Sequence, residues 1–293
     1  FTAAEAAKDA PDPTEILALW PDGPPGGERV TAVETHEARP PPPGLRDRIV
    51  THTRSPTMFV FRPERPNGAA IMICPGGGYI RVVRDKEGFE AARWLASRGY
   101  TCFVLTYRLP GDGWAAGANV PLQDAQRGLR LIRANAARYG VNPKRVGVQG
   151  FSAGGHVAAM LTTRFDDKVY EPVDAADVVS ARPDFSCLMY PVIALSGPLA
   201  HPGSAKEMSV GPAVPVERRV TRNTPPVFMV HAKDDPAVPV GNATLMADAL
   251  KAAGVPVELH LFETGNHGFG LRSIEGRPTA AWPGLFEAWL LRH

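Results

Sequence analysis

Cysteine is scarce in this chain, and long apolar runs are absent. Only three of the 293 residues are cysteine, Cys74, Cys102 and Cys187. An odd number cannot form a complete disulfide framework, and the spacing matches no metal-binding pattern, so we expect three buried, reduced thiols and no bound metal. No stretch of about 18 consecutive apolar residues occurs, so the sequence predicts no membrane-spanning helix.

A strong excess of charge of either sign is also missing. The chain carries 32 Lys and Arg against 30 Asp and Glu, a formal net charge of +2, and its arginines are spread along the sequence. This balance is too small to indicate nucleic acid or an anionic membrane as a partner. The fractions of hydrophobic residues (44%) and charged residues (21%) are ordinary for a globular protein. No internal repeat is present, and no pattern indicates an oligomeric state.

The most informative motif that is present is Gly150-Phe151-Ser152-Ala153-Gly154. It follows a short apolar run and opens into an alanine-rich helical pattern. Glycines two residues before and after a serine allow the sharp strand-to-helix turn that exposes a nucleophilic hydroxyl, because side chains at 150 and 154 would collide across the bend. Ser152 would then adopt a backbone conformation that costs roughly 1–3 kcal/mol, a strain typical of functional sites. Ser152 is therefore the predicted nucleophile.

A second glycine-rich segment suggests an oxyanion hole. The apolar run 69–74 has the pattern of a buried parallel strand and leads into Pro75-Gly76-Gly77-Gly78-Tyr79. Consecutive glycines let a backbone loop approach a ligand and aim its N–H groups inward. In acyl transfer such donors stabilise the oxyanion together with the N–H of the residue after the nucleophile, here Ala153. A flexible turn is the alternative, and which of the three glycines donate stays open.

An acid and a base follow in the order that this kind of fold requires. The strand pattern 224–231 runs into a turn that contains Asp234 and Asp235, and the strand pattern 257–262 leads into a loop that contains His267. An imidazole at that position is expected to take the serine proton while a carboxylate fixes its tautomer. The residues alone do not separate Asp234 from Asp235.

Eight histidines compete for the role of base. His231 and His260 fall inside strand patterns, and His156 follows the nucleophile by four residues on the same helix, so all three are predicted to be structural. Four others lie in loop-like or terminal segments with no supporting constellation: His36, His52, His201 and His293. His267 is therefore the predicted base.

Several blocks together resemble a known family. They are residues 74–79, 85–88, 107–110, 124–127, 150–156, 235–239 and 265–269. In combination they are similar to the α/β-hydrolase acetyl esterases associated with xylan degradation, within the esterase/lipase group, over roughly residues 45–293. The resemblance implies Ser152 as nucleophile, Asp235 as acid and His267 as base, with oxyanion donors at Gly77, Gly78 and Ala153. Hormone-sensitive-lipase-like enzymes have a histidine before the three glycines, whereas Pro75 here argues for the polysaccharide-esterase branch.

Strand patterns that alternate with helical ones predict an α/β-hydrolase fold, with a mostly parallel sheet flanked by helices and no large cap. Early strands are expected at 47–53 and 58–62 as an antiparallel pair. Helices are expected at 87–97 with Asp85 as N-cap, 121–139, 240–253 and 279–292. Residues 45–293 would form one catalytic domain. The proline-rich residues 1–44 would form an extended arm on the surface.

Two segments are expected to shape an open substrate site, residues 193–223 and the loop around Trp114. Tyr79, Trp114 and Phe269 are its candidate wall residues. The predicted reaction is two-step ester hydrolysis without a cofactor, releasing acetyl groups from xylan or a related plant polysaccharide or oligosaccharide. The alternatives are a general small-ester esterase, a prolyl-oligopeptidase-like peptidase and a non-catalytic binding protein of the same fold. A start at Phe1 and the family resemblance suggest a periplasmic or secreted protein without its signal peptide.

Overall fold

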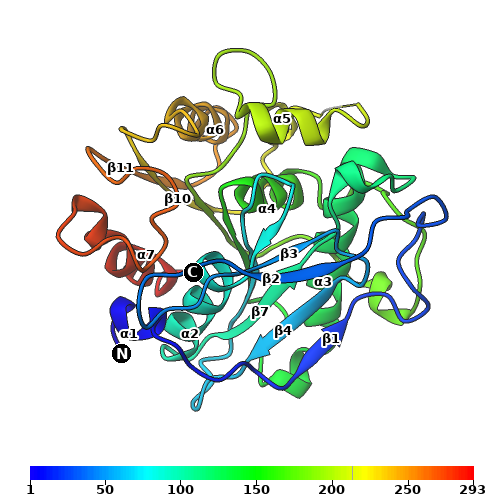
Figure 1. The fold of residues 1–293 in the computed structure, drawn as a ribbon, viewed down its shortest axis with the longest axis horizontal. Coiled ribbons are helices and arrows are strands. Elements are labelled where there is room, and N and C mark those ends of the chain that lie inside the picture. The colour runs from blue at the N-terminus through cyan, green and yellow to red at the C-terminus, as the bar shows by residue number, and fades with distance from the viewer. Residues whose placement is uncertain (213) are drawn as a thin grey trace.

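The computed structural model describes residues 1–212 and 214–293. Within them, eight strands form one sheet in the order β1-β4-β7-β5-β8-β9-β10-β11. The strands from β7 to β11 in that order pair in parallel, and β1 and β4 are antiparallel additions at one side. This is the mostly parallel sheet of an α/β-hydrolase fold (Figure 1). The strand bounds are β1 Ile16–Ala18, β4 Thr57–Phe61, β5 Ala70–Cys74, β7 Thr101–Thr106, β8 Val146–Phe151, β9 Ser186–Met189, β10 Val227–Ala232 and β11 Val257–Phe262.

Helices cover both faces of the sheet because its central strands are apolar on both sides. In β5, Met72 and Cys74 belong to one core cluster, whereas Ile71 and Ile73 belong to the other, as the alternation of side chains along a strand requires. The first cluster receives α3 (Val120–Ala134), α4 (Ala153–Thr163) and α6 (Gly241–Ala252). The second receives α1 (Ala3–Ala7), α2 (Glu90–Ala96) and α7 (Trp282–Leu290), which lie together in Figure 1.

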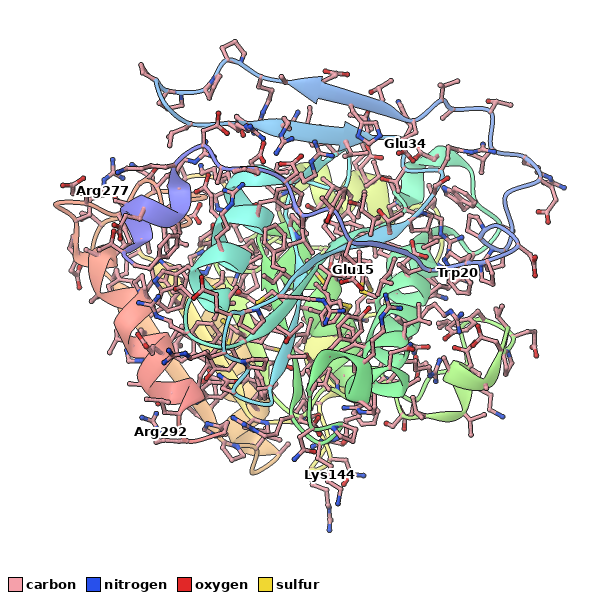
Figure 2. All side chains as sticks on the ribbon, turned by 90° about the horizontal axis from the view of Figure 1, so that it is seen from below. Glu15, Trp20, Glu34, Lys144, Arg277 and Arg292 are labelled. Atoms are coloured by element: carbon pink, nitrogen blue, oxygen red, sulfur yellow. The ribbon has the colours of Figure 1, made fainter. Side chains whose placement is uncertain are left out.

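A second, smaller sheet corrects the expected pairing of the early strands. β3 (Arg48–Thr51) pairs antiparallel with β2 (Thr35–Ala38) and with β6 (Val82–Val83), whereas β4 lies between β1 and β7 in the main sheet. The predicted pair 47–53 and 58–62 is therefore wrong as a pair, although both strands exist. β2 and β3 form the blue ribbon pair at the top of Figure 2, near Glu34.

Residues 1–44 are part of the domain and are not an extended surface arm. β1 adds a strand to the main sheet through β4, and α1 packs against α2. Leu19 and Trp20 are buried, and the Trp20 indole N–H donates to the Asp124 carboxylate at 2.8 Å. Trp20 and Glu15 are labelled on this segment in Figure 2. Strands of three or four residues between prolines are too short to leave a periodic pattern in the sequence, so the sequence alone predicts an arm where the structure has strands.

The predicted helices are present with shifted ends. α2 begins only at Glu90 because one π-helical turn, Asp85–Phe89, precedes it. Asp85 does not cap this helix, since its carboxylate accepts hydrogen bonds from the backbone N–H and the guanidinium of Arg48 at 2.7–2.9 Å. α3 ends at Ala134, and a 3-10 turn follows before Gly140, whose φ of 62° ends the segment.

The three cysteines are free and buried, as predicted. No helix in the described ranges 1–212 and 214–293 is both long and apolar enough to cross a bilayer.

Candidate active site

Ser152 occupies the turn between β8 and α4, with φ 54° and ψ −119°. This positive φ is the strained conformation that the flanking glycines predict. A Cβ at Gly150 would overlap the carbonyl oxygen of Gly154, and a Cβ at Gly154 would overlap the carbonyl of Cys74 on the neighbouring strand. Only glycine therefore fits at both positions, and the bend holds the serine hydroxyl at the carboxyl edge of the sheet.

His267 reaches this hydroxyl from the loop after β11. Its Nε2 lies 2.8 Å from Ser152 Oγ, and its Nδ1 lies 2.7 Å from Asp235 Oδ2, on the loop after β10. Because an ionised carboxylate can only accept, Nδ1 carries the proton and Nε2 accepts from the serine hydroxyl. The three residues thus form one continuous hydrogen-bonded chain, although 115 positions separate the serine from the histidine.

The surroundings of Asp235 hold it ionised. Burial of the carboxyl group opposes ionisation, but hydrogen bonds from His231 and His267 and from the backbone N–H of Val238 outweigh it and hold the pKa of Asp235 well below its ordinary value. Its Oδ1 accepts from the backbone N–H groups of Ala237 and Val238 at 2.9 and 2.8 Å. A carboxylate held in this way stays negative beside the imidazole and favours an imidazolium during reaction.

His231, predicted to be structural, is buried but contacts the acid directly. Its Nε2 lies 3.2 Å from Asp235 Oδ2 and 3.0 Å from the carbonyl oxygen of Val238. Since both neighbours are acceptors, Nε2–H is the donor. His231 is therefore a positioning residue for the carboxylate. Its location inside a strand pattern gave no signal of this, because the contact depends on how the chain turns back at 235–238.

The structure separates the two neighbouring aspartates. Asp235 binds the imidazole, whereas Asp234 Oδ1 accepts from the backbone N–H groups of Gly265 and Asn266 at 2.8 and 2.9 Å. One acid therefore contacts the predicted base, and its neighbour anchors the loop that carries that base. Asn266 has a φ of 56°, so this anchored loop is itself strained.

Three backbone amides are available for an oxyanion. The N–H of Gly76 is already used, because it donates to Glu87 Oε2 at 3.0 Å. The N–H groups of Gly77, Gly78 and Ala153 donate to no acceptor within the part of the chain that the structure describes. At Gly76 a Cβ would lie only 2.9 Å from the Ser152 Cβ, so the glycine loop passes directly beside the serine.

Glu87 is a buried carboxylate that the sequence reasoning did not single out. Its Oε2 holds the Gly76 N–H, and its Oε1 accepts from the Tyr190 hydroxyl at 2.9 Å. The Tyr190 oxygen in turn accepts from the backbone N–H of Gly270 at 3.1 Å, and the Tyr190 ring packs edge-on against His267 with centroids 5.1 Å apart. Glu87 thus connects the glycine-rich loop 75–79, called the oxyanion loop below, to the loop after β11 that carries His267, called the histidine loop. Its place on the π-turn before α2 could not be read from a helical pattern.

The three predicted wall residues are buried and pack inside the protein. Tyr79 is fully buried, and its hydroxyl lies 2.7 Å from His156 Nδ1, whose pKa burial lowers to about 3. Trp114 packs in a small cluster with Val30 and Val120, and Phe269 packs against Tyr190. The prediction that these rings wall the substrate site is therefore wrong. Tyr79 and His156 instead brace the oxyanion loop against α4.

The two segments expected to shape the site pack against each other. The segment 193–223 carries α5 (Pro202–Met208), which contacts the short 3-10 turns Pro110–Asp112 and Gly117–Asn119 of the Trp114 loop. His201, at the start of α5, lies over the oxyanion loop, because its Cε1 would be 3.8 Å from a Cβ at Gly78. The sequence had placed His201 among the residues without a constellation.

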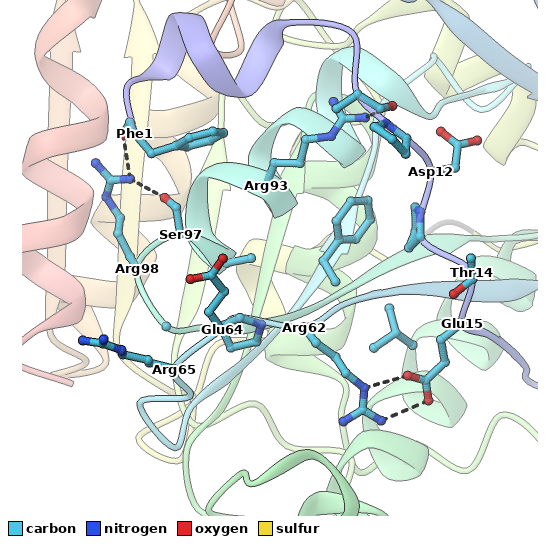
Figure 3. Close-up of a pocket in the computed structure, with 18 residues that line it drawn as sticks. Phe1, Asp12, Thr14, Glu15, Arg62, Glu64, Arg65, Arg93, Ser97 and Arg98 are labelled. Atoms are coloured by element: carbon cyan, nitrogen blue, oxygen red, sulfur yellow. Dashed lines mark hydrogen bonds and ion pairs between the residues drawn. The ribbon is translucent and has the colours of Figure 1, made fainter.

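A cavity of about 1030 Å³ lies away from these residues, between the N-terminal segment and the ends of β4 and α2 (Figure 3). Its polar groups largely satisfy one another. Arg62 pairs with Glu15 at 2.8 Å, and Arg98 pairs with Glu287 at 3.0 Å. Arg93 donates to the backbone carbonyls of Ala6 and Ala10. This cavity is a seam where the N-terminal segment packs, and it holds none of the chemistry around Ser152.

Comparisons with known proteins agree on one group of proteins. A model of the BD-FAE family matches residues 60–200, and one of the dienelactone hydrolase family matches residues 200–283. The crystal structure of an acetyl ester-xyloside bifunctional hydrolase from Caldicellulosiruptor lactoaceticus is 34% identical, covers 96% of this chain and 97% of its own, and superposes with a TM-score of 0.73.

Two curated relatives are named for activities on xylan. An acetylxylan esterase from Xylanibacter ruminicola is 36% identical over 73% of this chain and 43% of its own length. Endo-1,4-beta-xylanase B from Butyrivibrio fibrisolvens is 35% identical over 70% of this chain and 33% of its own length. The chain thus spans less than half of these relatives, so the match concerns one part of each.

Proposed function

Since this chain belongs to the esterases of the α/β-hydrolase fold, we propose that it is a serine carboxylesterase that removes acetyl groups from acetylated xylan or a related plant oligosaccharide. The observation that carries the proposal is the continuous hydrogen-bonded chain from Ser152 Oγ through His267 to Asp235, beside three unused backbone amides. The names of the acetylxylan esterase and the acetyl ester-xyloside hydrolase support acetylated sugars as the substrate class.

In the first step, Ser152 Oγ attacks the ester carbonyl while His267 Nε2 takes its proton. The negative charge moves onto the carbonyl oxygen, where the N–H groups of Gly77, Gly78 and Ala153 stabilise it. Loss of one such donor costs on the order of 3 kcal/mol of transition-state stabilisation. The imidazolium then protonates the departing alcohol oxygen, and the acetyl group remains bonded to Ser152.

In the second step, water attacks the acetyl-serine carbonyl and gives its proton to His267. The oxyanion forms again in the same amide site, acetate leaves, and the proton returns to Ser152 Oγ. Asp235 keeps its negative charge throughout and holds Nδ1–H of the imidazole, so that Nε2 always faces the serine. No cofactor takes part in either step.

Short acyl groups are the proposed preference. In its described residues, 193–212 and 214–223, the insertion beside the site carries only α5, of seven residues, and one 3-10 turn of four residues, Val216–Arg219. Such short elements do not build the long apolar channel that a fatty acyl chain needs. We expect higher kcat/KM on 4-nitrophenyl acetate than on the octanoate ester, and a clear preference for octanoate would contradict this.

Acetate release from acetylated xylo-oligosaccharides, compared between wild type and Ser152→Ala, tests the proposed reaction. We expect release by the wild type only. A fluorophosphonate probe that labels the wild type and not the variant would separate an active serine hydrolase from a non-catalytic binding protein. Acetyl-oligosaccharides left intact by a labelled enzyme would instead favour the general small-ester alternative.

We also propose that the protein works outside the cytoplasm, where plant polysaccharides are met. The proposal rests on the substrate class alone. Fractionation of the source cells, with esterase activity followed in medium, periplasm and cytoplasm, tests it. Activity confined to the cytoplasm would contradict export.

A further inference from the structure

Among the described histidines other than His267, His201 has a ring nitrogen that is neither buried nor hydrogen-bonded to another described residue. His201 begins the insertion helix α5 and lies over Gly78 of the oxyanion loop. Its Cε1 would lie 3.8 Å from a Cβ at Gly78, so the ring faces the glycine loop beside Ser152. Nothing in the ester-hydrolysis steps above uses this ring.

The tautomer of His201 is fixed by its own helix. The backbone N–H of Ser204 donates to His201 Nδ1 at 3.1 Å, and the Ser204 hydroxyl lies 2.8 Å from the same nitrogen. Nδ1 must therefore hold a lone pair, and the proton of the neutral ring is on Nε2. Burial, together with the charge of His267, lowers the pKa of His201, which favours this neutral form.

The resulting Nε2–H donor is unused. His201 Nε2 has no hydrogen-bond partner in residues 1–212 and 214–293, and it is not among the buried atoms that lack one, so it is open to solvent. The other exposed or half-buried histidine rings have carboxylate or carbonyl partners: His36 with Glu34, His52 with Asp112, His260 with Glu258 and His293 with the Trp289 carbonyl. A fixed donor without an acceptor at the mouth of a site is suited to a bound ligand.

The chemistry of an acetyl ester decides which half of the substrate can use this donor. An acetyl group offers one strong acceptor, its carbonyl oxygen, and the amides of Gly77, Gly78 and Ala153 are placed to take it. The methyl group accepts nothing. An acceptor for a donor beyond Gly78 must therefore come from the alcohol half, and a sugar supplies hydroxyl and ring oxygens there.

Aromatic stacking offers little to a sugar at this site. Among the residues that the structure describes, Phe1 is the only Phe, Tyr or Trp whose side chain is mainly exposed, and it lines the cavity at the opposite edge of the sheet. This favours polar contacts for the recognition of a sugar near Ser152.

We propose that His201 is a specificity-determining residue whose Nε2–H donates a hydrogen bond to a hydroxyl or ring oxygen of the sugar that carries the acetyl group. This inference rests on the proposed function and adds a substrate-binding contact to it. His201 thereby favours sugar acetates over acetates of alcohols that have no second oxygen.

His201→Asn tests the inference, because asparagine can still accept from the Ser204 N–H and cap α5, while its short amide does not reach the position of Nε2. We would measure kcat/KM on a mono-acetylated methyl β-xyloside and on phenyl acetate, whose alcohol half has no second oxygen. The sugar-to-aryl ratio should fall about tenfold, the value of one well-placed hydrogen bond, mainly through KM of the sugar ester. His260→Asn, whose ring pairs with Glu258 on β11, is the matched control and should keep the wild-type ratio.

The outcomes separate the two proposals. If wild type hydrolyses the aryl ester but not the sugar ester, the proposed substrate class fails, and the role of His201 fails with it. If wild type hydrolyses both and His201→Asn loses activity equally on both, or loses none, the inference about His201 alone is overturned. Thermal unfolding of each variant identifies a general loss of folding, and His201→Gln, whose longer amide can donate from nearer the Nε2 position, should recover part of the ratio.

Discussion

The main sheet has one edge formed by the carboxyl ends of its parallel strands and an opposite edge formed by their amino ends. The two differ in backbone strain and in the contacts of their charged side chains. At the carboxyl edge, Tyr79, Ser152, Tyr190 and Asn266 follow four different parallel strands, and all have positive φ, from 36° to 64°. The fifth such non-glycine residue in the described chain, His52, precedes β4, whose first residue pairs with the last residue of β7 at the same edge. The opposite edge holds the large cavity, and no non-glycine residue in its lining has positive φ.

This difference shows that empty volume does not locate the chemistry here. A strained backbone residue costs about 1–3 kcal/mol and persists only where surrounding contacts enforce it. At the carboxyl edge two of those contacts are buried, since Glu87 holds the glycine loop and His156 holds Tyr79, and the exposed Asp234 holds the histidine loop through its backbone N–H groups. At the opposite edge, pairs such as Arg62 with Glu15 are partly exposed and hold only the N-terminal segment.

The largest effect is expected for Ser152→Ala at the strained edge. Removing the hydroxyl removes the covalent route, and kcat should fall on the order of 10⁶-fold, as when the nucleophile of a serine protease is removed. Steady-state hydrolysis of 4-nitrophenyl acetate measures this, with the melting temperature as a control for folding. Turnover close to wild type would show that the strained serine has no catalytic role.

Gly77→Ala should rank second. Gly77 has φ 135°, and a Cβ there would overlap the carbonyl oxygen of Arg81, so the oxyanion loop must move. We expect kcat to fall about 10²-fold or more, the usual loss for one oxyanion donor. Gly23→Ala is the matched control, since Gly23 also has positive φ (89°) but nothing within 4 Å of its Cβ position. Equal losses in the two variants would mean that backbone strain alone, and not the loop's position, matters.

Glu87→Gln should reduce kcat about tenfold with little change in KM, because a hydrogen bond to a charged group is weakened between the two loops that carry the reacting groups. Rate and KM on one aryl ester give this split. Glu15→Gln, at the opposite edge, is the control acid and should leave both constants at wild-type values. A larger effect on KM than on kcat would contradict the positioning role of Glu87.

On the acid side, the profile of log kcat/KM against pH should reflect the binding of a single proton. The pKa of Asp235 is lowered from its ordinary value of 3.8, so the carboxylate stays ionised well below pH 3.8. The folding stability that it contributes is present above pH 3.8 and is lost as the pH falls towards the pKa of the folded state. Asp235 therefore adds no protonation step of its own to the acid side of the profile. We expect log kcat/KM to fall with a slope of one, or tenfold per pH unit. A slope of two would show that a second group must also be ionised.

The smallest effect is expected for Arg62→Ala, beside the large cavity. The partly exposed pair with Glu15 contributes at most about 1 kcal/mol to stability, and kcat/KM should not change. Chemical denaturation and aryl-ester hydrolysis measure the two quantities. A loss of activity without loss of stability would show that the opposite edge takes part in function.

What the sequence could predict was local. The geometry around Ser152 depends on the residues from 150 to 154, so the motif alone indicated the turn that is found. Asp234 and Asp235 could not be separated from the residues themselves, because their partners lie more than thirty positions away. Glu87 gains its role from contacts between separate loops, which no local pattern shows. His231 contacts Asp235 only four positions away, but that contact depends on how the chain turns back at 235–238. The N-terminal strands were missed because three or four residues carry no periodicity.

The central claim is that Ser152, activated by His267 and Asp235, is the group that becomes acylated. Peptide mapping by mass spectrometry after reaction with a fluorophosphonate tests this most directly. We expect the label on Ser152 in the wild type and a strong loss of labelling in His267→Ala. A label on another residue, or an unlabelled enzyme that still releases acetate, would contradict the account.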